Sequence, residues 1–316
     1  MRLPEGDDEA TESDGPDDRL SGRSAGQTAG TGGDGVEDPL GEVAATLDVR
    51  MVEASDGWRL RVFTWTPTDA IAAARRPLLF VPGWTSVVEG WRTLLAAWVE
   101  QRPVHYIETR EKNRTAPPEG HRERKVDFGI EQHMADLAAV SERLVDDVGA
   151  CDWYASSLGS TCLIEGFKSG AIDGRSAFLL APNARFKFPL WAIPLIHVPW
   201  WFYSPVIRLI ILPYLRLKLK ERGQYIRYRR TLRAAHMRRL KMCTLMARGY
   251  EMWEGLEAVS VPCAIAVAES DALHGLGDAL RISEMLPLGE VVEVESNQWA
   301  HEPSVIPLAE AWQDAI

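Results

Sequence analysis

Two adjacent serines, Ser156 and Ser157, are the first residues whose surroundings suggest covalent chemistry. They lie in CDWYASSLGSTCLIEGF, residues 151–167, between an apolar run typical of a buried strand and a run with helical spacing. A serine at a tight strand-to-helix turn can present its hydroxyl as a nucleophile. The same small residues could instead serve only to pack the strand against the helix, so the stretch leaves both interpretations open.

The flanking residues distinguish between the two serines. A nucleophile on a sharp turn needs small residues two positions before and two positions after it, because larger side chains collide with the adjoining strand or helix. Ala155 and Gly159 meet this requirement around Ser157. The bulky Tyr154 and Leu158 occupy the same positions around the other serine. Ser157 is therefore the better candidate for a nucleophile.

Two polar residues that follow later predicted strands could join Ser157. Asp271 comes directly after the apolar run PCAIAVAES, and His301 lies in NQWAHEP, which follows the run EVVEVES. The carboxyl ends of the strands are where an open α/β sheet collects its functional groups. We therefore expect Asp271 and His301 near the same edge of the sheet as Ser157.

Strands and helices alternate along most of the chain, which predicts an α/β protein with a mostly parallel central sheet flanked by helices. The first two strands are expected as a hairpin about Ser55-Asp56-Gly57. Residues 183–255 interrupt the alternation, so we expect the core to comprise 41–182 and 256–316. The other expected strands are 76–83, 103–109, 151–156, 176–182, 262–270 and 290–296.

The motifs VPGW, ASSLG, ESDALH and WAHEP resemble those of the α/β-hydrolase superfamily, in particular serine esterases and lipases with a lid insert. The resemblance covers roughly residues 46–316 except the insert. It implies that Ser157 attacks an acyl carbonyl, that His301 takes its proton and returns it to the leaving group, and that Asp271 holds the imidazole. A serine at this position also argues against the epoxide-hydrolase and dehalogenase branches, which use a carboxylate there.

The acid and the base each have an alternative interpretation. Asp271 could instead cap the helix that follows it, with Glu269 acting as the acid. His301 could be a loop histidine whose ring is satisfied by Glu302. The order of serine, acid and histidine along the chain is what favours the catalytic interpretation.

The resemblance further implies an oxyanion hole built from the backbone N–H groups of Leu158 and Trp84. Related proteins usually have His-Gly where this chain has Pro82-Gly83. Proline has no N–H to donate, and this departure bears on the second donor.

The insert, 183–255, is where the resemblance places a lid. Its first part, 188–217, is dominated by large apolar and aromatic residues, which fits a cover over an apolar pocket. Five prolines divide this part, so it offers no stretch of the roughly 20 residues that a membrane-spanning helix needs. We expect three of its tryptophans to contact the substrate: Trp191, Trp200 and Trp201.

The second part of the insert, 216–241, carries eleven Arg or Lys and a single acid, Glu221. Such a run is most often a solvated helix face. Beside an apolar segment it could also contact anionic lipid, so residues 188–241 are a candidate for peripheral membrane contact. A third interpretation is that the acidic N-terminal segment folds over it. No nucleic-acid-binding module accompanies these charges, so we expect no nucleic acid as partner.

The net charge of −10 comes mostly from residues 1–40, which hold eleven acidic and three basic side chains. This segment has almost no large apolar residues, so we expect it to be disordered. It also lacks the apolar region of a secretory signal, which favours a cytoplasmic protein. The cysteines have no metal-binding spacing and are expected as buried, reduced thiols: Cys151, Cys162, Cys243 and Cys263.

The function that these features favour is hydrolysis of a carboxylic ester with a hydrophobic group, through an acyl-enzyme on Ser157. An acyltransferase would use the same three residues. A catalytically silent protein that binds membranes or a partner through its insert is the alternative from a different class. The sequence contains no metal-ligand cluster, phosphate loop or dinucleotide fingerprint, so we expect no cofactor.

Overall fold

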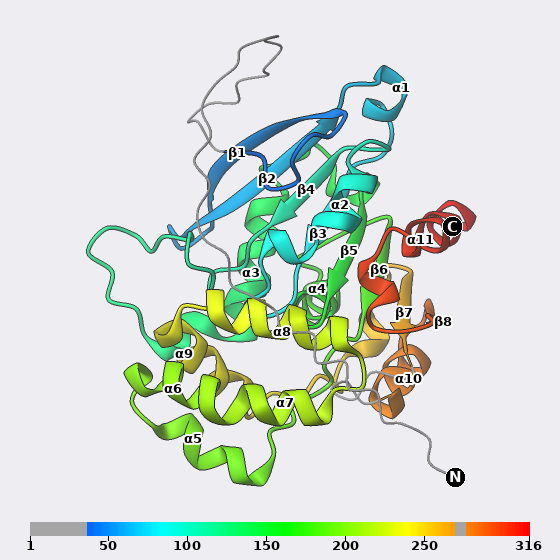
Figure 1. Ribbon diagram of the computed structural model, residues 1–316. Helices are drawn as coiled ribbons and strands as arrows, with labels where there is room; N and C mark the ends of the chain where they lie inside the picture. Colours follow the sequence, from blue (N-terminus) through cyan, green and yellow to red (C-terminus); the bar gives the residue numbers. More distant parts are fainter. Residues whose placement is uncertain (1–36, 269–275) are drawn as a thin grey trace, which may run out of the picture. The chain divides into compact units, whose positions relative to one another are not determined.

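The computed structural model describes residues 37–268 and 276–316, which contain an eight-stranded sheet (Figure 1). The strand order is β1-β2-β4-β3-β5-β6-β7-β8. β2 pairs with both β1 and β4 in antiparallel fashion, and all other pairs are parallel, as the sequence predicts. The strands are Ala45–Glu53 (β1), Arg59–Pro67 (β2), Leu78–Val81 (β3), Val104–Ile107 (β4), Asp152–Ser156 (β5), Ser176–Leu180 (β6), Cys263–Val267 (β7) and Gly289–Glu293 (β8).

Helices cover both faces of this sheet (Figure 1). One face packs against α3, α4 and α10, and the opposite face packs against α2 and α11. The short α1 follows β2. These helices are Ala70–Ala73 (α1), Arg92–Trp98 (α2), Ile130–Ser141 (α3), Leu158–Ser169 (α4), Leu276–Met285 (α10) and Val305–Ala315 (α11).

The central strands are apolar on both sides because both faces of the sheet are covered. In β3, for example, Leu79 and Val81 join the core beside α3 and α4, whereas Leu78 and Phe80 join the core beside α2 and α11. All four side chains are fully buried. This two-sided burial explains why the sequence shows continuous apolar runs here rather than an alternating pattern.

A row of stacked aromatic rings crosses four neighbouring central strands on one face. Phe80 stacks on Tyr106 at 5.4 Å and on Tyr154 at 5.1 Å, and Tyr154 stacks on Phe178 at 5.6 Å between ring centroids. The hydroxyl of Tyr154 donates a hydrogen bond of 2.9 Å to the carbonyl oxygen of Ala300. The row therefore ties the middle of the sheet to the loop that carries the predicted base.

Helices α5 to α9 lie between β6 and β7, within the segment 183–255 that the sequence sets apart from the core. The 3-10 turn Trp200–Phe202 (η5) separates α5 from α6, and the π-helical segment Ile207–Ile211 (η6) separates α6 from α7. α7 packs on α8, and α8 packs on the 3-10 turn Val88–Gly90 (η1) that follows β3. No helix among the described residues is both long and apolar enough to cross a membrane. The helices are Ile193–His197 (α5), Tyr203–Val206 (α6), Leu212–Lys218 (α7), Arg222–Ala234 (α8) and Met237–Ala247 (α9).

Candidate active site

Ser157 occupies the turn between β5 and α4 in a strained backbone conformation. Its φ and ψ are 51° and −111°, a combination that costs a non-glycine residue about 1–3 kcal/mol. Its own N–H donates to the carbonyl oxygen of Leu180 at 2.8 Å. Ser156, by contrast, is the last residue of β5 and lies in the extended strand. The structure thus gives the turn to the serine that the sequence favours.

The small neighbours of Ser157 are needed because other chain segments approach the turn closely. A Cβ atom added to Gly159 would lie 2.5 Å from the carbonyl oxygen of Val81 and 2.9 Å from that of Pro82. On the opposite side, a Cβ atom on Gly83 would lie 3.3 Å from the Cβ atom of Ser157. The loop after β3 therefore packs directly against the serine.

Asn183 contacts the Ser157 hydroxyl. Its amide nitrogen Nδ2 donates to Ser157 Oγ at 3.0 Å. The backbone N–H of Asn183 donates to Thr161 Oγ1 at 2.9 Å, and this hydroxyl in turn lies 3.1 Å from the carbonyl oxygen of Ser157. No motif in the sequence singles out Asn183. The one signal available was its place just after β6, at the same edge of the sheet as the other candidates.

His301 is held in a defined orientation by two neighbours. Its ring stacks on that of Trp91, with 4.2 Å between centroids and 19° between planes. Its Nδ1 lies 2.7 Å from the carbonyl oxygen of Asn297. A carbonyl can only accept, so this contact puts the hydrogen on Nδ1 and leaves Nε2 as the basic nitrogen of the neutral ring. Trp91 is itself fixed, because its indole N–H donates to Ser86 Oγ at 2.9 Å.

Ser157 and His301 line the same cavity, whose volume is about 370 Å³. The insert supplies part of its wall from three helices, with Leu215 on α7, Leu232 on α8 and Leu240 on α9. The three tryptophans expected to contact the substrate lie elsewhere. Trp191, Trp200 and Trp201 are absent from this wall and are 45%, 45% and 61% exposed.

Backbone strain among the described residues concentrates at this cavity. Three non-glycine residues have a φ in the left-handed region: Thr85 at 54°, Ser157 at 51° and Ala181 at 44°. All three line the cavity. Strained residues persist only where the surrounding structure enforces them, and they cluster at functional sites. Thr85 is the most unusual of the three because its side chain is β-branched.

The two expected oxyanion donors flank this site. Leu158 is the first residue of α4, whose N–H has no partner within the helix. Trp84 lines the cavity and lies in the loop after β3, between Gly83 and Thr85. Neither backbone N–H donates a hydrogen bond to another group in the part of the chain that the structure describes.

No family model and no curated protein matches the chain in sequence. Solved structures match over most of its length. An esterase from Thermogutta terrifontis has a TM-score of 0.64 at 16% identity and covers 86% of this chain and 99% of its own. An esterase from Exiguobacterium antarcticum has 0.64 at 12%, with 84% and 96% covered. The enol-lactonase from Burkholderia xenovorans LB400 has 0.61 at 14%, with 84% and 97% covered.

The chain has the α/β-hydrolase fold. Ser157 follows β5 and His301 follows β8, which are the strands after which the sequence places them. At 12–16% identity these three structural similarities show the architecture alone.

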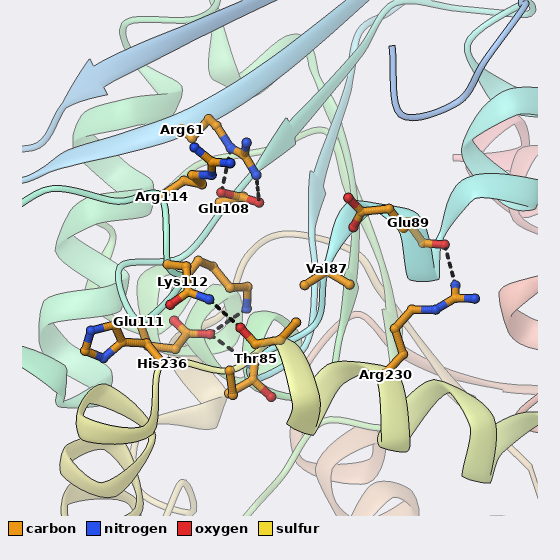
Figure 2. A pocket seen from close by; sticks show the side chains of 13 residues that line it. Arg61, Thr85, Val87, Glu89, Glu108, Glu111, Lys112, Arg114, Arg230 and His236 are labelled. Carbon is orange, nitrogen blue, oxygen red and sulfur yellow. Dashed lines mark hydrogen bonds and ion pairs between the residues drawn. The ribbon is translucent and has the colours of Figure 1, made fainter. Parts of the chain in front are cut away.

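In this α/β-hydrolase fold, a buried ion pair clamps the loop after β3 (Figure 2). Lys112 Nζ donates to the carbonyl oxygen of Gly83 at 2.9 Å and to Glu111 Oε1 at 2.5 Å. The same Oε1 accepts the backbone N–H of Thr85 at 3.0 Å. Both sides of Trp84 are therefore held by this pair, which fixes the direction of the Trp84 N–H.

Glu111 keeps its charge although it is completely buried. Burial alone would raise the pKa of the Glu111 carboxyl, but Lys112 and His133 outweigh it and hold the pKa well below the usual range. His133 Nε2 lies 3.2 Å from Glu111 Oε2. The signal for this cluster in the sequence was a run of charged residues, ETREK, directly after a buried strand.

A second cavity, of about 580 Å³, adjoins the same loop (Figure 2). Thr85 lines both cavities. The walls of the second cavity are largely charged, with Arg61 and Glu108 paired at 2.7 Å and Lys112 beside Glu111. The clamp on the loop therefore forms one wall of this polar cavity.

The proposed acid and its rival lie outside the described residues. Asp271 and Glu269 both belong to the segment 269–275, as does His274. The choice between the two acids stays a prediction from the sequence.

All four cysteines are buried and free, as expected. Burial raises the pKa of Cys151 to about 11 and of Cys263 to about 12, and it raises the pKa values of Cys162 and Cys243 well above the usual range. A thiolate is the reactive form of cysteine, so none of these side chains is suited to act as a nucleophile.

Proposed function

We propose that the protein is a serine hydrolase that cleaves a carboxylic ester bearing a hydrophobic group. The observation that carries this proposal is the strained conformation of Ser157, with φ of 51°, at a cavity that it shares with His301. A nucleophilic role would explain why a serine is held in this strained conformation, because strained residues cluster at functional sites. Solved structures with this fold include proteins named as esterases, a lipase and an enol-lactonase, which agrees with the proposed reaction class.

In the proposed reaction, Ser157 Oγ forms a bond to the acyl carbon while its proton passes to Nε2 of His301. The carbonyl oxygen becomes an oxyanion that accepts from the N–H groups of Leu158 and Trp84. The tetrahedral intermediate collapses, and the alkoxy group leaves as an alcohol with the proton from His301. Water then attacks the acyl-enzyme in the same way and releases the acid. Asp271 is proposed to stabilise the charged imidazole.

The proposed substrate class follows from the walls of the cavity. Apolar side chains from three helices of the insert line it together with Ser157, and the loop after β3 adds Trp84. The wall also carries charged side chains, among them Arg185, Lys187 and Arg227. In such a cavity the apolar part of the wall binds the hydrophobic part of a small ligand, and the polar groups orient it. We accordingly propose that the insert, 183–255, acts as a lid over the acyl or alkyl group.

The proposal is tested by measuring hydrolysis of p-nitrophenyl esters of short and long acyl chains. Wild-type protein is expected to hydrolyse them, and Ser157→Ala is expected to lose at least about 1,000-fold in kcat, because the nucleophile is removed. Ser156→Ala is the matched control, since it alters the adjacent hydroxyl at the end of β5 and is expected to retain most activity. Equal activity of Ser157→Ala and wild type, or no hydrolysis of any ester by wild type, would contradict the proposal.

A further inference from the structure

The outer surface of the insert exposes large apolar side chains. Eight of the sixteen large hydrophobic residues exposed among the described residues lie between 190 and 217. A globular domain rarely exposes such side chains together unless they contact a membrane or a partner. We call the following residues the outer apolar surface: Trp191, Trp200, Trp201, Phe202, Leu209 and Leu217.

The aromatic side chains of this surface lie in two groups of contacting rings. The ring centroids of Trp200 and Trp201 lie 5.9 Å apart, and those of Trp201 and Phe202 lie 6.4 Å apart. Trp191, before α5, contacts Tyr214 on α7 at 4.9 Å. The aromatic rings therefore span the helices from α5 to α7.

Unpaired basic side chains accompany the outer apolar surface. Arg208, Arg216, Lys218 and Lys220 are exposed, and none of them forms an ion pair with any residue that the structure describes. Residues 190–249 hold thirteen Arg or Lys and a single acid, Glu221. That acid contacts the segment after β8, where it accepts the backbone N–H of Gln298 at 2.7 Å. Arg208, Arg216 and Lys218 directly adjoin Leu209 and Leu217 in the chain, so they add positive charge beside the outer apolar surface.

The same helical run has a second face that lines the active-site cavity. Ile211 and Leu215 belong to the cavity wall, whereas Leu209 and Leu217 point to solvent with 69% and 89% of their surfaces exposed. In Figure 1, α5, α6 and α7 lie on the side of α8 that faces away from the sheet. One layer of helix thus separates the outer apolar surface from the cavity.

We propose that the outer apolar surface docks onto an anionic lipid bilayer. Tryptophan lies at the boundary between headgroups and acyl chains, because its ring is apolar and its N–H is polar. Phenylalanine and leucine beside it bury their apolar side chains at the same boundary. Arginine and lysine beside them are attracted to negatively charged headgroups, at roughly a five-fold gain in binding for each residue near the surface. Both kinds of side chain are present here on one surface.

Charge favours a bilayer over a second copy of the chain as the occupant. Symmetric pairing of two copies through this surface would bring the same unpaired cations against each other. An anionic bilayer supplies the opposite charge over its whole plane. The docking requires no activity of Ser157, so it stands apart from the proposed function.

Docking has a consequence that does rest on the proposed function. If Ser157 hydrolyses esters, a docked insert places the apolar wall of the cavity one helix away from the acyl chains. An ester dissolved in the bilayer could then reach the cavity without crossing water. Esters presented in anionic vesicles should accordingly be better substrates than the same esters in vesicles of phosphatidylcholine alone.

The proposal is tested by sedimenting the full chain with vesicles of phosphatidylcholine, alone or mixed with phosphatidylglycerol. Binding is expected only with the anionic mixture and is expected to weaken as salt is raised, because salt screens exposed charges. Arg216→Glu/Lys218→Glu/Lys220→Glu should weaken binding roughly 100-fold or more. Leu209→Ser/Leu217→Ser should weaken it about ten-fold through lost apolar contact.

Matched controls use side chains of the same kind away from this surface. Ile71→Ser/Leu288→Ser removes two exposed aliphatic side chains, which are 81% and 52% exposed. Arg122→Glu/Lys125→Glu reverses two exposed charges on another segment. Both controls should bind vesicles like wild type, and Ser157→Ala should as well.

Three results would overturn the proposal. The first is wild-type protein that does not bind anionic vesicles, and the second is binding that the variants of the outer apolar surface leave unchanged. The third is evidence that something else covers this surface. Light scattering could show a dimer that Leu209→Ser/Leu217→Ser dissociates, or cross-linking could join residues 1–36 to this surface in protein that does not bind vesicles. Hydrolysis of a soluble short ester tests only the proposed function, and vesicle binding by Ser157→Ala tests only the docking. The failure of one proposal can therefore be distinguished from the failure of the other.

Discussion

At the scale of single residues, the site depends on a serine that the surrounding chain forces into an unfavourable conformation. Gly159 has no room for a side chain beneath Val81, and Gly83 lies against the Cβ atom of Ser157. The sequence predicts both the serine and the need for small neighbours, because the turn is local. It does not predict Asn183, because the contact between residues 157 and 183 depends on the pairing of β5 with β6.

Asn183 gives a prediction at this scale. Asn183→Ala removes the donor to Ser157 Oγ and is expected to lower kcat/KM roughly five-fold, which is the effect of one ordinary hydrogen bond. Asn183→Asp should lower it further, because a carboxylate cannot donate and puts negative charge beside the developing oxyanion. Steady-state kinetics on a soluble ester measure both effects. Wild-type rates in Asn183→Asp would show that this contact has no part in the reaction.

At the scale of elements, contacts from a neighbouring segment hold the backbone of the loop after β3 in place. Lys112 and Glu111 follow β4, the neighbouring strand in the sheet. Lys112 donates a hydrogen bond to the carbonyl oxygen of Gly83, and Glu111 accepts one from the N–H of Thr85. The pair is a positioning device for the Trp84 N–H. The sequence shows the charged run ETREK after β4, but it does not show that this run contacts Gly83 and Thr85, because the contact joins two segments that are separate along the chain.

Lys112→Met tests this positioning role. The variant removes the donor to Gly83 and is expected to lower kcat about 100-fold with little change in KM, because a small misplacement of a transition-state donor acts on the rate. Lys168→Met is the matched control. Lys168 Nζ also donates to one carboxylate and one carbonyl, at 2.9 Å each, but it lies away from the loop. If both variants lost only thermal stability and kept kcat, the clamp would be purely structural.

The elements themselves were largely predictable where packing and sequence agree. The run with helical spacing that follows Ser157 forms α4, Leu158–Ser169, whose apolar side chains are buried and which ends at Gly170. The insert was less predictable. Almost every side chain of 188–217 is apolar, so periodicity could not tell which face lines the cavity, and the tryptophans expected inside lie outside.

At the scale of the whole molecule, a buried charge cluster anchors the amino end of β5. Asp152 is fully buried and accepts from Arg102 at 2.5 Å, Ser176 at 2.7 Å and Arg175 at 3.0 Å. Burial alone would raise the pKa of Asp152, but Arg102 and the other donors outweigh it and lower the pKa. Arg102 lies just before β4, Asp152 begins β5 and Ser176 begins β6. The cluster therefore joins three strands at the end of the sheet opposite the site.

Asp152→Ala is expected to lower the free energy of unfolding by about 3 kcal/mol at pH 7, because it leaves the buried Arg102 without its main partner. The pKa is lower in the folded state, so the stabilisation is present above the unfolded value of about 3.9 and is lost as pH falls below it. Urea unfolding should therefore show a large difference at pH 7 that shrinks below about pH 4. Asp314→Ala, which breaks an exposed pair with Arg76, is the control and should change little. A difference that stays constant down to pH 3 would contradict this account of Asp152.

The central claim is that Ser157 is a nucleophile, and reaction with a fluorophosphonate followed by peptide mapping tests it most directly. The strained turn and the shared cavity with His301 predict one labelled site, Ser157, in the folded protein, and no labelling after unfolding or in Ser157→Ala. Labelling of another residue, or folded protein that does not react, would contradict the account.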